Sequence, residues 1–177
     1  LERELAEVRL ERAQLEIEAR EDFEDRRSIW TRAIELFAAN TAELYERPGQ
    51  LILEVADGGG LRLGYEIERS ASQGVQEMMV FCFDLTVAQL WSERPVKPGF
   101  LIHDSSIFDG VDERQVARAL MLAARDSEHY GFQYACTLNS DLVPWDELDP
   151  NLDLRNAVVL ELTDKDETGG LFGTRFG

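Results

Sequence analysis

The run Phe-Leu-Ile-His-Asp occupies residues 100–104, and Ser-Gln-Gly-Val-Gln-Glu at residues 72–77 lies about one helix length before it. An apolar run that ends in an acid is typical of a buried strand that delivers one carboxylate to its C-terminal tip. Many nucleotide-binding folds hold Mg²⁺ beside a phosphate in this way. The two segments therefore predict half of a nucleotide site, with Asp104 as its metal ligand.

A phosphate-binding loop is missing from these residues. A loop of the form GxxxxGK[ST] needs a lysine directly after a glycine. The only lysines are Lys97, which follows a valine, and Lys165, which follows an aspartate. We therefore expect that this segment alone neither binds ATP tightly nor hydrolyses it.

Composition excludes some classes of function. The 177 residues are 44% apolar, enough to bury a sizeable core, and carry 35 acids against 18 bases, a net charge of −17. Such a surface repels nucleic acid, so direct DNA contact by this segment is disfavoured. Cys82 and Cys136 lie in apolar stretches and indicate reduced, buried thiols of a cytoplasmic protein rather than a disulfide. No apolar span is long enough for a membrane, and we expect a soluble protein.

Residues 1 to about 46 contain no proline or glycine and predict one long helix. Its first half carries an apolar stripe at 3-4 spacing, interrupted by Arg12, which favours a coiled-coil arm over an ordinary surface helix: Leu1, Leu5, Val8, Leu15 and Ala19. The second half has a broader apolar face and should pack on the globular part. We therefore predict an arm and connecting helix at residues 1–46 and a head at residues 47–177.

Two strands, residues 51–55 and 61–67, are predicted around the sequence Asp-Gly-Gly-Gly at residues 57–60. These glycines favour a hairpin turn over a phosphate cradle, because no helix follows them. Helices are expected from Gln73 to about Trp91 and from the cap residue Asp112 to near Gly131.

Further strands are expected along the second half of the chain, at residues 100–104, 132–138, 157–162 and 171–176. The first two are predicted to be buried strands. Helices that alternate with strands predict an α/β head with parallel central strands and a small antiparallel hairpin.

Asp104, Asp109 and Asp112 fall within nine residues of one another. Asp104 leaves the core at a strand tip and can hold a metal ion through water. A solvated loop with a helix cap explains Asp109 and Asp112 equally well. His103 alternates to one face of the strand and is interpreted as a core or rim histidine, with metal ligation as the alternative.

Ser72-Gln73-Gly74 lies directly before the long apolar helix. The hydroxyl and the backbone N–H groups would thus sit at the positive end of the helix dipole, which is an anion-binding arrangement. A simple helix cap by Ser72 is the alternative.

Taken in order, residues 72–76, residues 100–104, Asp109 and residues 133–139 resemble the C-terminal half of an SMC-like or RecN-like ABC ATPase head. They match that family's signature loop, Walker B strand, D-loop and switch strand. The stretches FLIHDSSIFDGVDERQ, FQYACTLNSD and LFGTRF also resemble an uncharacterised bacterial domain at the C-terminal end of SMC-like coiled-coil proteins, of the kind found in ABC-three-component defence systems. The resemblance covers nearly the whole chain.

The resemblance implies ATP and Mg²⁺ as cofactors, bound only together with an N-terminal lobe that carries the P-loop. Ser72, Gln73 and Gly74 would bind the γ-phosphate of ATP held by the opposite head. Asp104 would hold the Mg²⁺ shell, and Asn139 would stand at the switch position.

Two departures from the family pattern argue against fast hydrolysis. Ser105 stands where the family has a glutamate, and Asn139 stands where it has a histidine. A serine does not readily accept a proton from water at neutral pH, so we predict Asp109 as the substitute catalytic residue.

The leading hypothesis is therefore the C-terminal lobe of an SMC-like head, which completes a composite ATP site with a second head in a homodimer. Head closure would be coupled to DNA- or partner-related work, such as repair or phage defence. The rival hypothesis is a non-enzymatic module that only dimerises or docks an effector protein. A third is a metal-dependent phosphoesterase that uses Asp104, Asp109 and His103, with Asp141 or Asp164 as further ligands.

Overall fold

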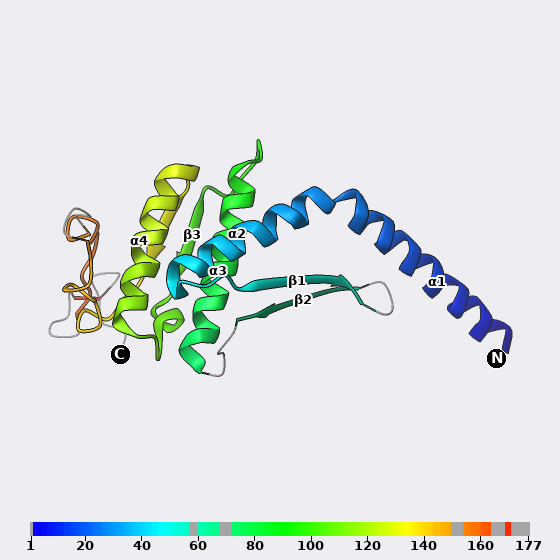
Figure 1. Ribbon diagram of the computed structural model, residues 1–177, viewed down its shortest axis with the longest axis horizontal. Coiled ribbons are helices and arrows are strands. Elements are labelled where there is room, and N and C mark those ends of the chain that lie inside the picture. The colour runs from blue at the N-terminus through cyan, green and yellow to red at the C-terminus, as the bar shows by residue number, and fades with distance from the viewer. Residues whose placement is uncertain (1, 57–59, 68–71, 150–153, 164–168, 171–177) are drawn as a thin grey trace. The chain divides into compact units, whose positions relative to one another are not determined.

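A computed structural model of the protein describes all residues except 1, 57–59, 68–71, 150–153, 164–168 and 171–177. The chain divides into two units, Leu1–Glu147 and Leu148–Gly177, and each is described by itself. The larger unit contains every helix and strand of the described residues (Figure 1): α1 Glu2–Asp25, α2 Arg27–Tyr45, β1 Gln50–Val55, β2 Leu61–Glu66, α3 Gln73–Ser92, β3 Phe100–His103, the short 3-10 helix η1 Ser105–Phe108, α4 Glu113–Tyr130 and β4 Gln133–Cys136. The predicted α/β class is confirmed.

The amino-terminal helix is interrupted once. Arg26 leaves the helical region of backbone space, with φ −96° and ψ 12°, and separates α1 from α2. Phe23 and Trp30 stack across this interruption with their ring centroids 5.8 Å apart. The prediction of one continuous helix is wrong at this point, because neither proline nor glycine marks the break.

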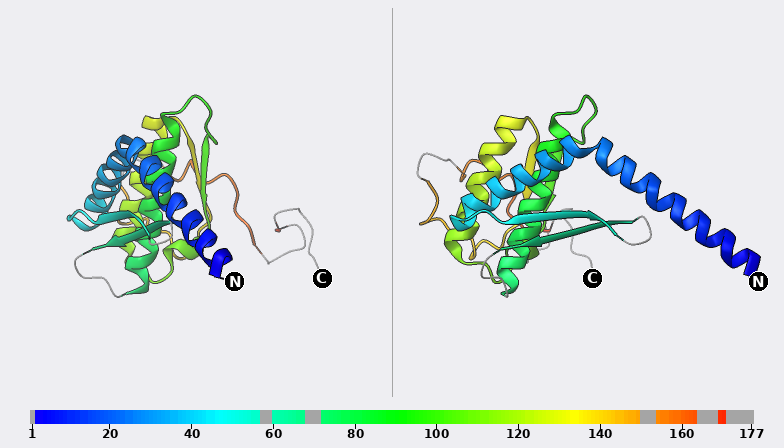
Figure 2. Two further views of the ribbon diagram at one scale, coloured as in Figure 1. Left: turned by 90° about the vertical axis from the view of Figure 1, so that its right-hand side faces the viewer. Right: turned by 45° about the vertical axis from the view of Figure 1, so that its right-hand side comes forward.

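α1 exposes its apolar stripe. The side chains of Leu5, Val8 and Leu15 are each more than half exposed, at 52%, 61% and 53%. Figure 1 and the right-hand view of Figure 2 show α1 leading away from α2, α3 and α4. The helix itself is confirmed, and its pairing with another helix stays a prediction.

A buried polar network joins α2, α3 and α4. Asn40 of α2 donates to Thr86 Oγ1 at 3.1 Å and to Gln89 Oε1 at 3.0 Å. Gln89 of α3 donates in turn to Asn40 Oδ1 at 3.1 Å and to Asp126 Oδ2 of α4 at 2.6 Å. Arg125 donates to the other oxygen of Asp126 at 3.0 Å. Every member of the network is hydrogen-bonded, so these polar groups fix how the three helices pack instead of loosening the core.

The predicted hairpin is confirmed. β1 and β2 pair antiparallel, with Leu51 opposite Tyr65. Leu51 is buried, and the Tyr65 ring lies 6.5 Å from that of Phe37 in α2. The glycines predicted to form the turn lie mostly outside the described residues.

In the part of the chain that the structure describes, the second sheet consists of β3 and β4, which pair in parallel, with His103 opposite Cys136. Leu101 and His103 face inward, whereas Phe100 and Ile102 are 57% and 63% exposed. The prediction of parallel strands is confirmed, but the prediction that both are buried is wrong. A run of apolar residues does not show which of the two faces of a strand is covered by other parts of the same chain.

Caps set the ends of the helices beside this sheet. The Asp112 carboxylate accepts a hydrogen bond from the N–H of Arg114 and begins α4, and Gly131, with φ 68°, ends it. Ser72 precedes α3 and accepts a long hydrogen bond of 3.4 Å from the N–H of Val75. The predicted boundaries of both helices are therefore confirmed within one or two residues.

The unit Leu148–Gly177 contains no strand among its described residues. Residues 157–162, predicted as a strand, form the end of a turn and an unpaired segment in which Val159 is 96% exposed. The prediction is wrong for this segment, because a β-prone run becomes a strand only when a partner completes its hydrogen bonds. The strand predicted at residues 171–176 lies outside the described residues.

Both cysteines are free, as predicted, with Cys82 buried and Cys136 partly buried. Burial raises the pKa of the Cys82 thiol and keeps it protonated. Among the described helices, none is long and apolar enough to cross a membrane.

Gln89→Leu should lower the free energy of unfolding by about 1–3 kcal/mol, because it removes the hydrogen bonds that Gln89 donates to the buried Asn40 Oδ1 and Asp126 Oδ2. Urea unfolding of the 177-residue chain measures this loss. Gln76→Leu, at an exposed position of the same helix, is the matched control and should change stability by about 0.5 kcal/mol or less. Equal effects of the two substitutions would contradict the role assigned to the network.

Candidate functional site

Asp104 lies directly after β3, at the carboxyl end of the parallel pair, and is exposed. Thr137 lies directly after β4, and its hydroxyl donates to Asp104 Oδ1 at 2.8 Å. The same hydroxyl accepts the N–H of Ser105 at 3.0 Å. The parallel register therefore brings together the exits of the two strands, as expected for the ends of neighbouring parallel strands.

These contacts keep Asp104 charged. The hydrogen bond from Thr137 lowers the pKa of the Asp104 carboxyl below its ordinary value, and the backbone of Ser105 and Ser106 adds to this effect. An exposed, ionised carboxylate at a strand tip is a group that Mg²⁺ takes as a ligand while it keeps several of its waters. The donor set fits a water-bound Mg²⁺ held by one protein carboxylate.

His103 does not belong to this site. It is buried, with Nδ1 3.1 Å from the Tyr134 hydroxyl and Nε2 3.2 Å from Asp84 Oδ2. Its ring also lies 5.2 Å from that of Phe81 in α3. The interpretation as a core histidine is confirmed, since both ring nitrogens have partners on the side of the strand that faces the helices.

No described group of three His, Cys, Asp or Glu side chains is arranged to hold a metal ion. The hypothesis of a phosphoesterase site built from Asp104, Asp109 and His103 therefore lacks its ligand set within that part of the chain. Asp164, one of the further ligands it needed, lies outside the described residues.

Gly74, at the start of α3, packs against the turn that holds Asp109 and Gly110. A Cβ atom added at Gly74 would overlap the backbone carbonyl of Gly110 and would also press on Val111. Gly110 itself has φ 69°, a conformation that favours glycine. Close packing of two backbone segments thus explains Gly74 without any ligand, and it brings the Ser72–Gly74 segment next to Asp109.

Asn139 lies two residues beyond Thr137 and is exposed. Its backbone carbonyl accepts the N–H of Leu142 at 2.9 Å. The segment that follows β4 therefore contacts the site through Thr137. Thr137 was not identified as a site residue from the sequence. The register would have found it, because a parallel pair that begins at Phe100 and Gln133 places Thr137 opposite Asp104.

Gly74→Ala should lower the free energy of unfolding by about 1–3 kcal/mol, because the new methyl group must displace the backbone of Gly110. Gly64→Ala in β2 is the control: its nearest neighbour would be Ile52 Cβ at an ordinary 3.8 Å, and no loss is expected. Thermal unfolding followed by circular dichroism compares the two. If Gly74→Ala is as stable as the original chain, the close contact is not formed in solution.

Solved structures similar to this fold are SMC ATPase head domains. A crystal structure of the SmcHead bound to the C-winged helix domain of ScpA is 20% identical with a TM-score of 0.46; the match covers 63% of this chain and 35% of that one. A structure from work on ATP-driven dimerization and DNA-stimulated activation of SMC ATPases is also 20% identical with a TM-score of 0.46, over 66% of this chain and 74% of that one. The chain thus spans about a third of the length of the first of these structures.

No curated protein matches the sequence. Residues 40–176, more than half of the chain, match the model of a family described as an uncharacterised protein conserved in bacteria, DUF2326. The matched range includes every candidate site residue from Ser72 to Asn139. The chain belongs to this bacterial family.

Proposed function

We propose that this chain is the C-terminal lobe of an SMC-like ATPase head, and that a second lobe outside these residues completes the head and supplies the P-loop. The observation that carries the proposal is a parallel strand pair with the ionised carboxylate of Asp104 at its carboxyl end; within the described residues its outer face is exposed and no further strand pairs with β3. Ligands of open α/β sheets bind at this end of the strands.

The open edge of β3 supports the need for a further lobe. The carbonyl of Gly99 accepts the N–H of Gln133 at 2.8 Å, and that of His103 accepts the N–H of Thr137, directly after β4, at 3.1 Å. Successive residues of a strand point their N–H and C=O groups to opposite sides. The backbone N–H and C=O groups of Phe100 and Ile102 therefore point away from β4. Within the described residues no strand pairs with this edge. Parallel sheets occur almost only with both faces covered, so the pair is incomplete as it stands.

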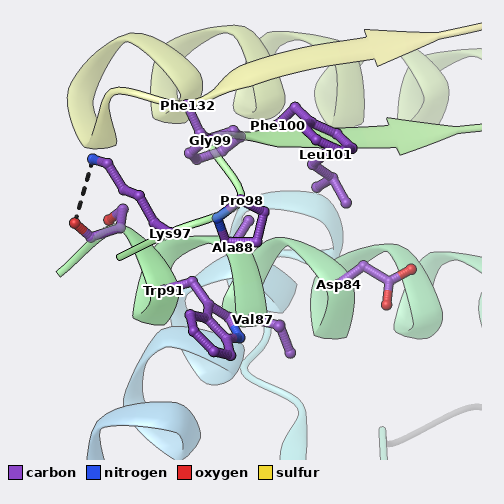
Figure 3. Close-up of a pocket in the computed structure, with 11 residues that line it drawn as sticks. Asp84, Val87, Ala88, Trp91, Lys97, Pro98, Gly99, Phe100, Leu101 and Phe132 are labelled. Carbon is purple, nitrogen blue, oxygen red and sulfur yellow. Dashed lines mark hydrogen bonds between the residues drawn. The ribbon is translucent and has the colours of Figure 1, made fainter. Parts of the chain in front are cut away.

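Beside the open edge, α3 provides an apolar floor. A groove of about 180 Å³ lies between β3 and the second half of α3, lined by Val87, Ala88 and Trp91 on the helix and by Pro98 and Phe100 on the strand side. Figure 3 shows Val87 and Trp91 along the helix, below the start of the strand. Trp91 is 44% exposed. A strand added beside β3 would form hydrogen bonds with the unpaired backbone groups of its edge and would cover these side chains.

In this proposal each candidate residue has one task. Asp104 would hold the water shell of Mg²⁺, and the ion would supply positive charge that neutralises the phosphates. Ser72, Gln73 and Gly74 would serve the ATP of a second head in a homodimer, and Asn139 would act at the switch position. Asp109 would replace the missing glutamate as the base.

The arm, residues 1–46, would transmit the conformational change of head closure away from the head. The exposed stripe of α1 supports a coiled coil with another helix, so that a change at the heads would reach DNA or a partner bound elsewhere. Repair and phage defence are the settings that we propose for this work. The net charge of −17 argues against DNA binding by the lobe itself.

A non-enzymatic docking module is the second candidate. It is favoured by the contacts that explain the key residues without nucleotide: Thr137 satisfies Asp104, and Gly110 fills the space beside Gly74. Such a module would dimerise or hold an effector protein. It predicts that charge at Asp104 is unimportant for the assembly.

Asp104→Asn in the longer protein that contains this chain should reduce Mg²⁺-dependent ATP turnover at least about tenfold, because the amide loses the charge that holds the ion. Asp112→Asn is the matched control. Asp112 is also an exposed aspartate of lowered pKa, held by Arg114, but its place is the start of α4. Turnover that survives Asp104→Asn, or that falls equally in both variants, would favour the docking module.

A further inference from the structure

Thr137 makes three hydrogen bonds where β3 and β4 end. Its N–H donates to the carbonyl of His103 at 3.1 Å, and its hydroxyl accepts the N–H of Ser105 at 3.0 Å. The hydroxyl proton is then directed to Asp104 Oδ1, 2.8 Å away. One residue thus holds the backbone on both sides of Asp104 and the carboxylate between them.

The single hydroxyl oxygen both donates and accepts in this set of contacts. A valine of nearly the same shape would keep the backbone bond to His103 and lose both bonds of the side chain. The Asp104 carboxylate is exposed, and its other hydrogen-bond partners, Ser105 and Ser106, are its own neighbours in the chain. Without Thr137 no partner from the neighbouring strand holds the carboxylate, and it would sample more of its staggered rotamers. A ligand that is spread over several rotamers holds a cation less well than one held in a single orientation.

We propose that Thr137 is the positioning residue of Asp104: it holds the carboxylate in the orientation in which it receives a water-bound divalent cation. The inference rests on the proposed function for the presence of that cation. The same contact holds the segment that carries Asn139 at the tip of β3. It therefore keeps Asn139 near Asp104.

The contact itself can be tested in the 177-residue chain by amide hydrogen exchange. In Thr137→Val the N–H of Ser105 loses its acceptor and should exchange about three to ten times faster, the equivalent of one net hydrogen bond. Thr137→Ser keeps the hydroxyl and should restore the original rate. The N–H of Gly131, bonded to the carbonyl of Ser127, is the internal reference and should not change in either variant.

The positioning role is tested in the longer protein by the dependence of ATP turnover on Mg²⁺. Thr137→Val should raise the Mg²⁺ concentration for half-maximal turnover about tenfold and lower the maximal rate less. Thr137→Ser should return it to within about twofold of the original value. A residue with a purely structural role would change protein stability and leave the Mg²⁺ requirement where it was.

The outcomes separate this inference from the proposed function. Unchanged Ser105 exchange in Thr137→Val overturns the contact. Faster exchange with an unchanged Mg²⁺ requirement, while Asp104→Asn abolishes turnover, leaves the proposed function standing and overturns the positioning role. If the unaltered protein shows no Mg²⁺-dependent ATP turnover at all, the proposed function is wrong, and the positioning role falls with it.

Discussion

The parallel register of β3 with β4 is the constraint on which the candidate site depends. Because His103 lies opposite Cys136, Asp104 and Thr137 leave their strands side by side. The inward faces of the same strands fix the register, since the rings of His103 and Tyr134 both pack on Phe81, at 5.2 and 6.4 Å. A slip by one residue would turn these rings outward and separate Asp104 from its partner. Packing in the interior thus positions a carboxylate at the rim.

α3 connects that sheet to the rest of the larger unit. Its middle carries Phe81, which supports β3 and β4, and its second half carries Gln89, which is bonded to both α2 and α4. Its first residues include Gly74, held against the turn of Gly110. The segment that could meet a phosphate and the loop that follows Asp104 are therefore braced by one helix.

The sequence predicted most of the secondary structure, because local signals decide it. Ser72, Asp112 and Gly131 mark helix ends through their own backbone and side-chain chemistry. Two features had no such signal: the break at Arg26 lacks proline or glycine, and the partner of Asp104 became visible only through the strand register. The burial of residues 100–104 was overestimated, because an apolar run does not show which face of a strand is covered. The strand predicted at residues 157–162 failed because no described strand pairs with this segment.

The account holds that β3 is an inner strand of a larger sheet that other residues complete. Hydrogen exchange at the N–H of Ile102, which points to the open edge, tests this most directly. The N–H of Thr137, bonded to His103, is the reference and should be protected throughout. In the 177-residue chain the N–H of Ile102 should exchange almost freely, and in the longer protein it should be protected at least about a hundredfold. Equal, rapid exchange of Ile102 in both proteins would contradict the account.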